Sequence, residues 1–308
     1  MATSANADDV RIATFNTELA RKGPGLLLRD ILDPTPDVQS VQDAINTVNP
    51  DIIAIQSFDY DLTSAALKAF SDSLASPYPY FFALPPNTGV PTGVDLNSDG
   101  RTGTEKDAQG FGAFRGQGGM AILSRFPFQT EAAIDHSDII WSSIEGGLWD
   151  APDVLNAAAR PLQRLSTTAH WQVPLKINGM TLTLLTYHAS PPVFDGPEDR
   201  TGRRNADETL FWLPILESVK NPILLGDANL DPTRGDGRSD AMKRLLAHPA
   251  LQDPHAQSDS VVFQQTGPLR VDYVLPATTL DIADAGVYWP QGDDPSRHAL
   301  IWVDVSLP

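Results

Sequence analysis

Short apolar runs that end in polar residues recur along the chain. They are rich in Val, Ile, Leu and aromatic residues, as buried strands are, and they cover residues 10–15, 51–55, 182–187, 222–225, 271–275 and 299–305. Polar residues such as Asn16, His188 and Asp227 follow some of these runs directly. Because a sheet holds its strand ends still while the adjoining loops reach solvent, we predict a group of chemically active side chains at these ends.

The segment Gly-Asp-Ala-Asn at 226–229 is the most informative of these strand ends. Asp227 and Asn229 lie one residue apart after a buried run, so their side chains are expected to point the same way. Gly, Asp and Asn are also ordinary turn residues. The segment alone leaves a turn and a site equally open, and the recurrence of the pattern favours a site.

Helical periodicity separates the apolar runs. Helices are predicted at 39–48, 62–74, 207–219 and 239–246, with Asp37 and Asp61 placed as N-cap acids. Asn178 and Gly179 predict a hairpin turn between strands at 165–173 and 180–186. This order of elements in two similar halves predicts an α/β fold, a four-layer α/β/β/α sandwich with two mixed, mainly antiparallel sheets.

Residues 85–119 lack such periodicity and are rich in Gly, Asp, Asn and Thr. We expect one domain over 1–308 with this segment as a long irregular insertion, of the kind that is usually functional or mobile. Within it, Asp95, Asn97 and Asp99 match the first half of a calcium loop, but Lys106 stands where the twelfth-position glutamate belongs. A calcium site and a plain Asx-rich loop therefore both stay open.

Charge narrows the class of ligand. The chain has 22 basic and 39 acidic residues and a formal net charge of −17, whereas nucleic-acid binders usually present a basic face. Arginines gather only locally, at 200–204 and at Arg115, Arg125 and Arg160. We expect a small phosphorylated substrate rather than nucleic acid, although an acidic nuclease that relies on bound cations stays open.

The compartment is not fixed by the sequence. The chain has no cysteine, which excludes disulfides and thiolate chemistry, and no hydrophobic run long enough to cross a membrane. Residues 1–9 lack the apolar core of a secretory signal. The acidic composition is compatible with export or a saline habitat, and we favour an exported mature chain with no obligate protein partner.

Six polar residues in this order, together with the segment at 119–125, resemble the endonuclease/exonuclease/phosphatase superfamily of metal-dependent phosphoesterases. The six are Asn16, His188, Asp227, Asn229, Asp272 and His298. The resemblance spans nearly the whole chain. Each motif is short, and their order and spacing carry the assignment.

The resemblance implies a role for each position. Asn16 would help to organise a metal ion and the attacking water, and Asp227 would orient or deprotonate that water. His188 would contact the phosphoryl oxygens, and Asn229 would stabilise the charged transition state. Asp272 would orient the ring of His298, which makes physical sense because a carboxylate on one ring nitrogen fixes the tautomer and supports a positive imidazolium.

The segment at 194–205 resembles a motif of a bacterial, often exported branch of the same superfamily. It contains several arginines and precedes a predicted helix, so it could form an anion pocket beside His188. We expect most of its charges to pair with each other. Arg204 and Asn205 are the residues expected to face a ligand.

Two positions depart from the family pattern. Ser57 stands where the family places a metal-binding glutamate, and Arg297 replaces an acid in the usual Ser-Asp-His. A hydroxyl is a weak ligand for a hard cation, and a guanidinium cannot bind one. Ser57 could mark a weakened site or an introduced substitution, or Asp59 could supply the missing carboxylate. Arg297 could hold phosphate bidentately or form a plain surface pair.

The sequence thus predicts a hydrolase that cleaves a phosphate ester by in-line attack of an activated water. The metal ligands would be Asn16, position 57 and Asp59, with Mg²⁺ or Mn²⁺ as the cofactor and Ca²⁺ as an option at 95–99. The alternatives are a catalytically impaired, anion-binding relative of such enzymes and a cation-dependent nuclease. Ser57 and Arg297 are the features that separate them.

Overall fold

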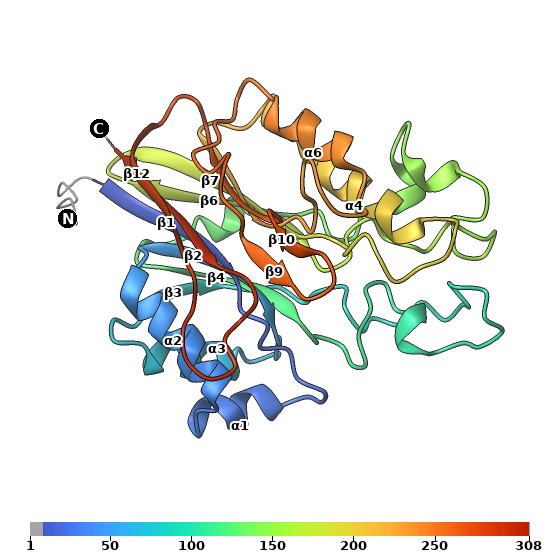
Figure 1. Cartoon of the computed structure of the whole chain (residues 1–308), viewed down its shortest axis with the longest axis horizontal. Coiled ribbons are helices and arrows are strands. Elements are labelled where there is room, and N and C mark those ends of the chain that lie inside the picture. The colour runs from blue at the N-terminus through green and yellow to red at the C-terminus, as the bar shows by residue number, and fades with distance from the viewer. Residues whose placement is uncertain (1–8, 308) are drawn as a thin grey trace.

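The computed structural model describes residues 9–307. The expectation about a signal-type segment falls mostly on residues 1–8, which lie outside the described residues. Two sheets pack face to face, with helices on both outer sides (Figure 1). Among residues 9–307, no helix is long and apolar enough to cross a membrane.

The first sheet contains both ends of the described chain. Its strands are, in spatial order, β12 (Asp281–Tyr288), β13 (Leu300–Ser306), β1 (Asp9–Asn16), β2 (Ile52–Phe58), β4 (Gly119–Ser124) and β3 (Tyr80–Phe82). The β1 and β2 strands are parallel and the other pairs are antiparallel. Because β1 and β2 are parallel with Asn16 opposite Gln56, their last residues reach the same edge of the sheet.

The second sheet repeats this plan. Its strands are, in spatial order, β11 (Asp272–Pro276), β8 (Pro222–Asp227), β7 (Met180–His188), β6 (His170–Ile177) and β5 (Ile134–Asp135). Only β7 and β8 are parallel, with His188 opposite Asp227, and β11 runs back so that Asp272 also lies opposite Asp227. A separate two-stranded ribbon consists of β9 (Val261–Phe263) and β10 (Gly267–Leu269).

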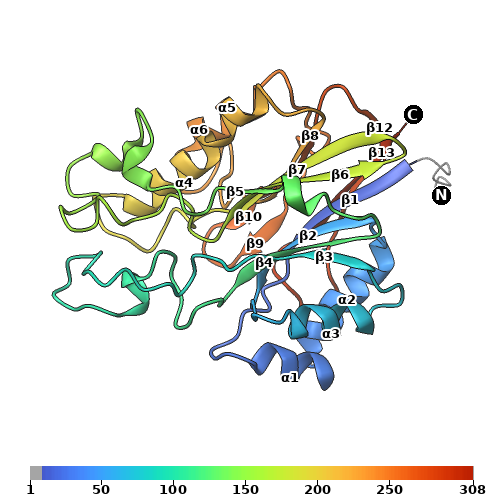
Figure 2. The same cartoon turned by 180° about the vertical axis from the view of Figure 1, so that it is seen from behind.

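Helices cover the outer face of each sheet (Figure 2). The first sheet carries α1 (Leu26–Leu32), α2 (Pro36–Val48) and α3 (Ala65–Ser73), and the second carries α4 (Arg200–Leu210), α5 (Trp212–Leu216) and α6 (Ser239–Leu246). The fold is therefore the predicted four-layer α/β/β/α sandwich with two mixed sheets.

Central strands are buried on both faces, which explains their unbroken apolar runs. In β2, Ile52 faces the core between the sheets and Ile53 faces the helices. In β7, Leu184 and Leu185 divide in the same way. Burying one such side chain fully stabilises the fold by about 1.5–3 kcal/mol.

Several predicted elements differ from the structure. The helix predicted at 207–219 begins at Arg200 and breaks after Leu210, because Pro214 has no N–H to donate to the carbonyl of Leu210. The helix predicted from 62 begins only at Ala65, with the Asp61 carboxylate accepting its first amides. Strand β6 starts at His170 rather than 165.

The hairpin turn at Asn178 and Gly179 is confirmed. Ile177 pairs with Met180, and both turn residues have positive φ, 49° and 85°, as this tight turn requires. Helix α1 and strands β9, β10 and β12 were not predicted. Strand β12 has no fully buried residue and alternates weakly, so its sequence carries little signal of a strand.

The segment at 85–119 has one short 3₁₀ turn, Glu105–Asp107, and is tied to the rest of the chain. Its Leu96 is buried with Trp141, Leu155 and Leu165 in a small separate core. The Asp107 carboxylate accepts the amide of Leu96 and both donors of Thr104. These contacts give the irregular segment a defined path.

Candidate functional site

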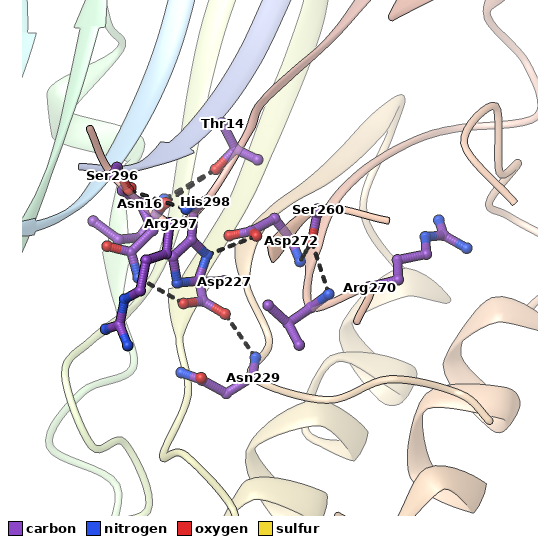
Figure 3. Close-up of polar contacts among 12 residues, drawn as sticks. Thr14, Asn16, Asp227, Asn229, Ser260, Arg270, Asp272, Ser296, Arg297 and His298 are labelled. Atoms are coloured by element: carbon purple, nitrogen blue, oxygen red, sulfur yellow. Dashed lines mark hydrogen bonds and ion pairs between the residues drawn. The ribbon is translucent and has the colours of Figure 1, made fainter. Parts of the chain in front are cut away.

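The ends of the two parallel strand pairs meet at one place (Figure 3). Asn16 ends β1, His188 ends β7, Asp227 ends β8 and Asp272 begins β11. His298 lies two residues before β13 and contacts Asp272. The structure thus brings together residues that the sequence spreads over nearly its whole length.

Asp227 is the centre of this group and is completely buried. Its Oδ2 atom accepts the Asn16 side-chain amide at 2.7 Å and lies 3.5 Å from Nε2 of His188. Its Oδ1 atom accepts the backbone amide of Asn229 at 2.8 Å. Burial, reinforced by the neighbouring Asp272, raises the pKa of Asp227 above its ordinary value, against the opposing effect of the two histidines and Asn16.

His298 and Asp272 form a second buried pair. Nδ1 of His298 lies 2.8 Å from Oδ2 of Asp272, and the hydroxyl of Ser260 accepts the Asp272 amide at 2.9 Å. Burial alone would lower the pKa of His298, but the Asp272 carboxylate outweighs it and raises that pKa to about 9. His298 is therefore a cation at neutral pH, held with Asp272 on Nδ1.

His188, in contrast to His298, is uncharged. Burial lowers the pKa of His188 although Asp227 opposes the shift, so the ring is neutral at pH 7. Its Nδ1 atom is buried and has no hydrogen-bond partner within the described residues. One protonated and one neutral imidazole thus flank the same carboxylate, and neighbouring groups with separated pKa values are characteristic of acid and base pairs.

Local backbone geometry holds the two loops in place. Gly226 has a φ of 141°, and a Cβ atom there would lie 2.1 Å from the carbonyl oxygen of Tyr187, so only glycine fits against β7. Asn229 has a φ of 50°, and its side-chain amide donates to the carbonyl of Ala189 at 2.9 Å. The loop after β8 is thereby fastened to the loop after β7.

Arg204 and Asn205 do not face a ligand, contrary to the sequence-based expectation. The buried Arg204 guanidinium donates to the carbonyls of Leu165, Arg164, Ser166 and Gln109. The Asn205 amide donates to the carbonyls of Ser190 and Ala228. Both side chains face inward from α4 and supply donors to loop carbonyls, those of the segment at 164–168 for Arg204 and those of the loops after β7 and β8 for Asn205.

The predicted metal ligands Ser57 and Asp59 have structural features that account for both residues without a metal ion. Ser57 has a left-handed φ of 55° at a bulge where the pairing of β2 with β4 shifts register. The Asp59 carboxylate accepts the amides of Arg21 at 3.0 Å and Gly118 at 2.8 Å, one on each oxygen. Asp59 thus anchors two loops, and we do not include it among the candidate metal ligands.

Arg297 forms an ion pair, one of the two alternatives that the sequence left open, and its partner is Glu18, which the sequence analysis did not identify. Its Nε and Nη2 atoms donate to Oε1 of Glu18, and its backbone amide donates to Oε2 at 2.7 Å. Glu18 is linked to the site through its own amide, which donates to Oδ1 of Asn16 at 3.2 Å. Glu18 lies two residues after Asn16, and that spacing was the only signal that could have identified it.

A divalent cation has a candidate site, but not the predicted one. Among residues 9–307, one group of three acidic or histidine side chains has ligand atoms within 4.8 Å of one another, namely Asp227, Asp272 and His298. Oδ1 of Asp272 is buried, and no hydrogen-bond partner for it lies among residues 9–307, so this carboxylate has an oxygen left for a ligand. Two carboxylates and an imidazole fit a divalent cation, and these three residues could hold one.

In the possible calcium loop, the carboxylates already accept hydrogen bonds from backbone amides of the same loop. The Asp95 carboxylate accepts the amides of Asp99 at 3.2 Å and Gly100 at 2.8 Å, and Asp99 accepts the amide of Arg101. The Asn97 amide donates to Asp99. These contacts make an Asx-rich turn, and within the described part of the chain no group of three acidic or histidine side chains forms there.

Comparison with known proteins agrees with this geometry. The sequence matches the model of the Endonuclease/Exonuclease/phosphatase family over residues 13–298. No curated protein matches the sequence.

Solved structures share the fold at low identity. An endonuclease/exonuclease/phosphatase from Beutenbergia cavernae is 18% identical with a TM-score of 0.59, over 97% of this chain and 72% of that one. Sphingomyelinase C from Streptomyces griseocarneus is 15% identical, with a TM-score of 0.54 and coverage of 96% and 99%. The 3′ phosphatase NExo from Neisseria, bound to a product DNA hairpin, is 16% identical, with a TM-score of 0.55 and coverage of 97% and 100%.

Proposed function

The chain belongs to the endonuclease/exonuclease/phosphatase family, and on that premise we propose that it hydrolyses the phosphate ester of a small anionic substrate. The observation that carries this proposal is the buried cluster in which Asp227 lies between a neutral His188 and a protonated His298. A carboxylate that can accept a proton and an imidazolium that can donate one are the two groups that ester hydrolysis by water requires.

In the proposed mechanism, Asp227 orients the attacking water and accepts its proton, for which the raised pKa of its carboxylate suits it. Asn16 holds the carboxylate through the 2.7 Å hydrogen bond and fixes the direction of attack. The water attacks phosphorus in line with the leaving oxygen. His188 and Asn229 would contact the phosphoryl oxygens as negative charge develops there.

His298 is proposed to supply a proton or a hydrogen bond through its ring. Its Nδ1 atom is committed to Asp272, which leaves Nε2 to donate a hydrogen bond or a proton to an anionic oxygen. Because its pKa is about 9, the ring carries its proton at pH 7 and recovers it after each turnover.

Metal dependence is a separate part of the proposal. A divalent cation held by Asp227, Asp272 and His298, for which we propose Mg²⁺ or Mn²⁺, would polarise a phosphoryl oxygen. His298 would have to give up its proton to become a ligand, so the cation and the imidazolium exclude each other. Ca²⁺ at Asp95, Asn97 and Asp99 would have to displace the turn hydrogen bonds described above.

Turnover of chromogenic phosphate mono- and diesters tests the proposal. Asp227→Asn and His298→Gln should each lower kcat by about a hundredfold or more, the typical cost of losing one preorganised group. His248→Ala is the matched control and should retain wild-type rates, because this partly exposed side chain accepts a hydrogen bond from Ala250 in its own loop, away from the site. Wild-type turnover in both site variants would contradict the assignment.

A second candidate is an anion-binding protein without hydrolytic activity, which Ser57 and the Arg297–Glu18 pair favour. A panel of phosphate mono-, di- and triesters with Mg²⁺, Mn²⁺, Ca²⁺ or a chelator separates the two candidates. Phosphate binding without turnover under every condition would select the binding protein, and turnover of any ester that Asp227→Asn abolishes would select the hydrolase.

A further inference from the structure

Arg297 and Glu18 form a structural unit at the edge of the site. Two guanidinium nitrogens and the Arg297 backbone amide all donate to the Glu18 carboxylate. The hydroxyl of Ser296 donates to the carbonyl of Asn16 at 2.8 Å. The segment that carries Arg297 is thereby fastened to the end of β1 by Ser296 and to the loop after β1 by the ion pair.

The aromatic ring of Phe263 packs against the same segment. The Arg297 guanidinium carbon lies 5.0 Å from the centre of the Phe263 ring, and the His298 ring meets Phe263 edge-on at 5.8 Å. Arg297 and His298 therefore rest on one residue of β9. Figure 3 shows both beside Asn16 and Asp227.

The ion pair leaves part of the guanidinium free. Glu18 takes Nε and Nη2, and among residues 9–307 the structure shows no partner for Nη1. The Arg297 side chain is 57% exposed, whereas that of Glu18 is 23% exposed, so the free edge is the one that solvent reaches. A guanidinium presents five N–H donors in a planar fork, and one edge can bind a carboxylate while the other binds a phosphate.

We propose that Arg297, positioned by Glu18, binds the phosphoryl group of the substrate and makes this binding independent of a divalent cation. The proposal rests on the proposed function and names a further residue that contacts substrate and a positioning residue behind it. Glu18 is bound at the same time to Asn16, so it sets the fork relative to the rest of the site.

The contacts of the site leave Arg297 available for this role. The Glu18 carboxylate pairs with one edge of Arg297, and the Asp272 carboxylate lies against Nδ1 of His298. His298 therefore has only Nε2 left for a phosphoryl oxygen. An incoming phosphoryl group needs a further fixed positive charge, and Arg297 is the arginine of this cluster.

Calorimetric titration with inorganic phosphate in a chelating buffer tests the proposal. Wild-type protein should bind phosphate without added metal, and Arg297→Ala should weaken binding about tenfold to a hundredfold, as expected for a charge-assisted hydrogen bond. Arg297→Lys, which keeps the charge but loses the fork, should fall between the two.

Arg125→Ala is the matched control. Arg125 also has an ion pair, with Asp51 at 3.3 Å, and an aromatic neighbour, Tyr78 at 5.1 Å, but it lies beside the start of β2, at the opposite end from the site. Its phosphate affinity should equal that of the wild type. Unchanged affinity in Arg297→Ala, or wild-type binding that appears only with Mg²⁺ or Mn²⁺, would overturn the proposal.

The sign of the Glu18 effect tests the positioning role. If Glu18 only repelled the anion, Glu18→Ala would tighten phosphate binding, whereas loss of positioning weakens it by several-fold. In the Arg297→Ala background the weakening should disappear, since the two residues act as one unit. Tighter binding in Glu18→Ala alone would refute positioning.

Ester turnover by the same variants separates this proposal from the proposed function. Arg297-dependent phosphate binding with no hydrolysis of any ester would support Arg297 and reject the hydrolase. Hydrolysis that depends on Asp227 but is equal in wild type and Arg297→Ala would support the hydrolase and reject the role of Arg297. Thermal unfolding of each variant confirms that the fold is retained.

Discussion

At the residue scale, several residues of this site have two hydrogen-bond partners each. Asp227 accepts hydrogen bonds from Asn16 and from the Asn229 backbone, and Glu18 joins Asn16 to Arg297. A substitution at one of these residues therefore alters a network, and its effect will not add simply to that of a neighbour.

Position 57 gives a prediction at this scale. The double variant Ser57→Glu, Arg297→Asp restores the two acids of the family pattern, and it should bind one more Mn²⁺ per chain than the wild type in calorimetric titration. Glu18 would then be free of its arginine and could contribute a further carboxylate.

Ser64→Glu with Arg297→Asp is the control for that double variant. Ser64 has a left-handed φ of 53°, close to that of Ser57, but it precedes α3 away from the site. Equal Mn²⁺ binding by both double variants, or none by either, would show that position 57 does not hold a cation.

Asn16, His188 and Asp227 could be predicted to converge, because each ends a buried strand and the register of the parallel pairs brings such ends together. His298 precedes its strand, and only the family resemblance implied its place beside them. Arg204 could not be placed, because whether an arginine faces solvent or caps buried carbonyls depends on the path of the segment at 164–168. Glu18 was missed since its partner is 279 positions away.

At the element scale, α4 holds the loops that carry the site. Asn205 donates to the carbonyls of Ser190 and Ala228, in the loops that follow His188 and Asp227. The Glu208 carboxylate accepts the amides of Ser190 at 2.7 Å and of Thr167. The strongly polar helix α4 thus has a buried polar face. Its side chains bond backbone groups of loops that lie beyond the ends of the strands.

Asn205→Ala should destabilise the protein and slow turnover together. Two buried carbonyls lose their donor, and each such loss costs about 1–3 kcal/mol. Urea unfolding measures the loss, for which Gln39→Ala, at an exposed position of α2, should show less than about 0.5 kcal/mol. An Asn205→Ala protein as stable and as active as the wild type would show that α4 does not position the loops.

His170 predicts how stability depends on pH. Burial lowers the pKa of His170 to about 3, against an ordinary value of 6.5, and the ring packs on Trp212 with Glu208 and Ser166 at its nitrogens. The unfolded chain therefore binds a proton that the folded chain does not, and stability falls as pH drops below 6.5.

That fall should amount to about 1.4 kcal/mol per pH unit from this residue alone. Urea unfolding of the wild type and of His170→Gln between pH 7 and pH 4 measures it. The His170→Gln protein should be less stable at pH 7 but show a shallower decline on acidification. Parallel declines in both proteins would rule out His170 as the source.

At the scale of the whole molecule, the net charge predicts weak affinity for duplex DNA. With a formal net charge of −17, the protein should repel duplex DNA at long range. We predict no retention of duplex DNA in a gel-shift assay at low salt with micromolar protein. Duplex binding that weakens steeply with salt would instead indicate a basic groove and revive the cation-dependent nuclease.

The sandwich architecture itself was predictable from the sequence. Unbroken apolar runs in β2, β7 and β8 require cover on both faces, which two stacked sheets with outer helices provide. The weakly patterned edge strand β12 and the small ribbon of β9 and β10 were not predictable, because their placement depends on packing against residues distant in the sequence.

A crystal structure of the protein soaked in inorganic phosphate tests the central claim most directly. We predict one phosphate ion in contact with His188, His298 and Arg297, close to Asp227 where the two sheets meet. A saturating soak that leaves this place without phosphate, while the ion binds elsewhere on the surface, would contradict the account.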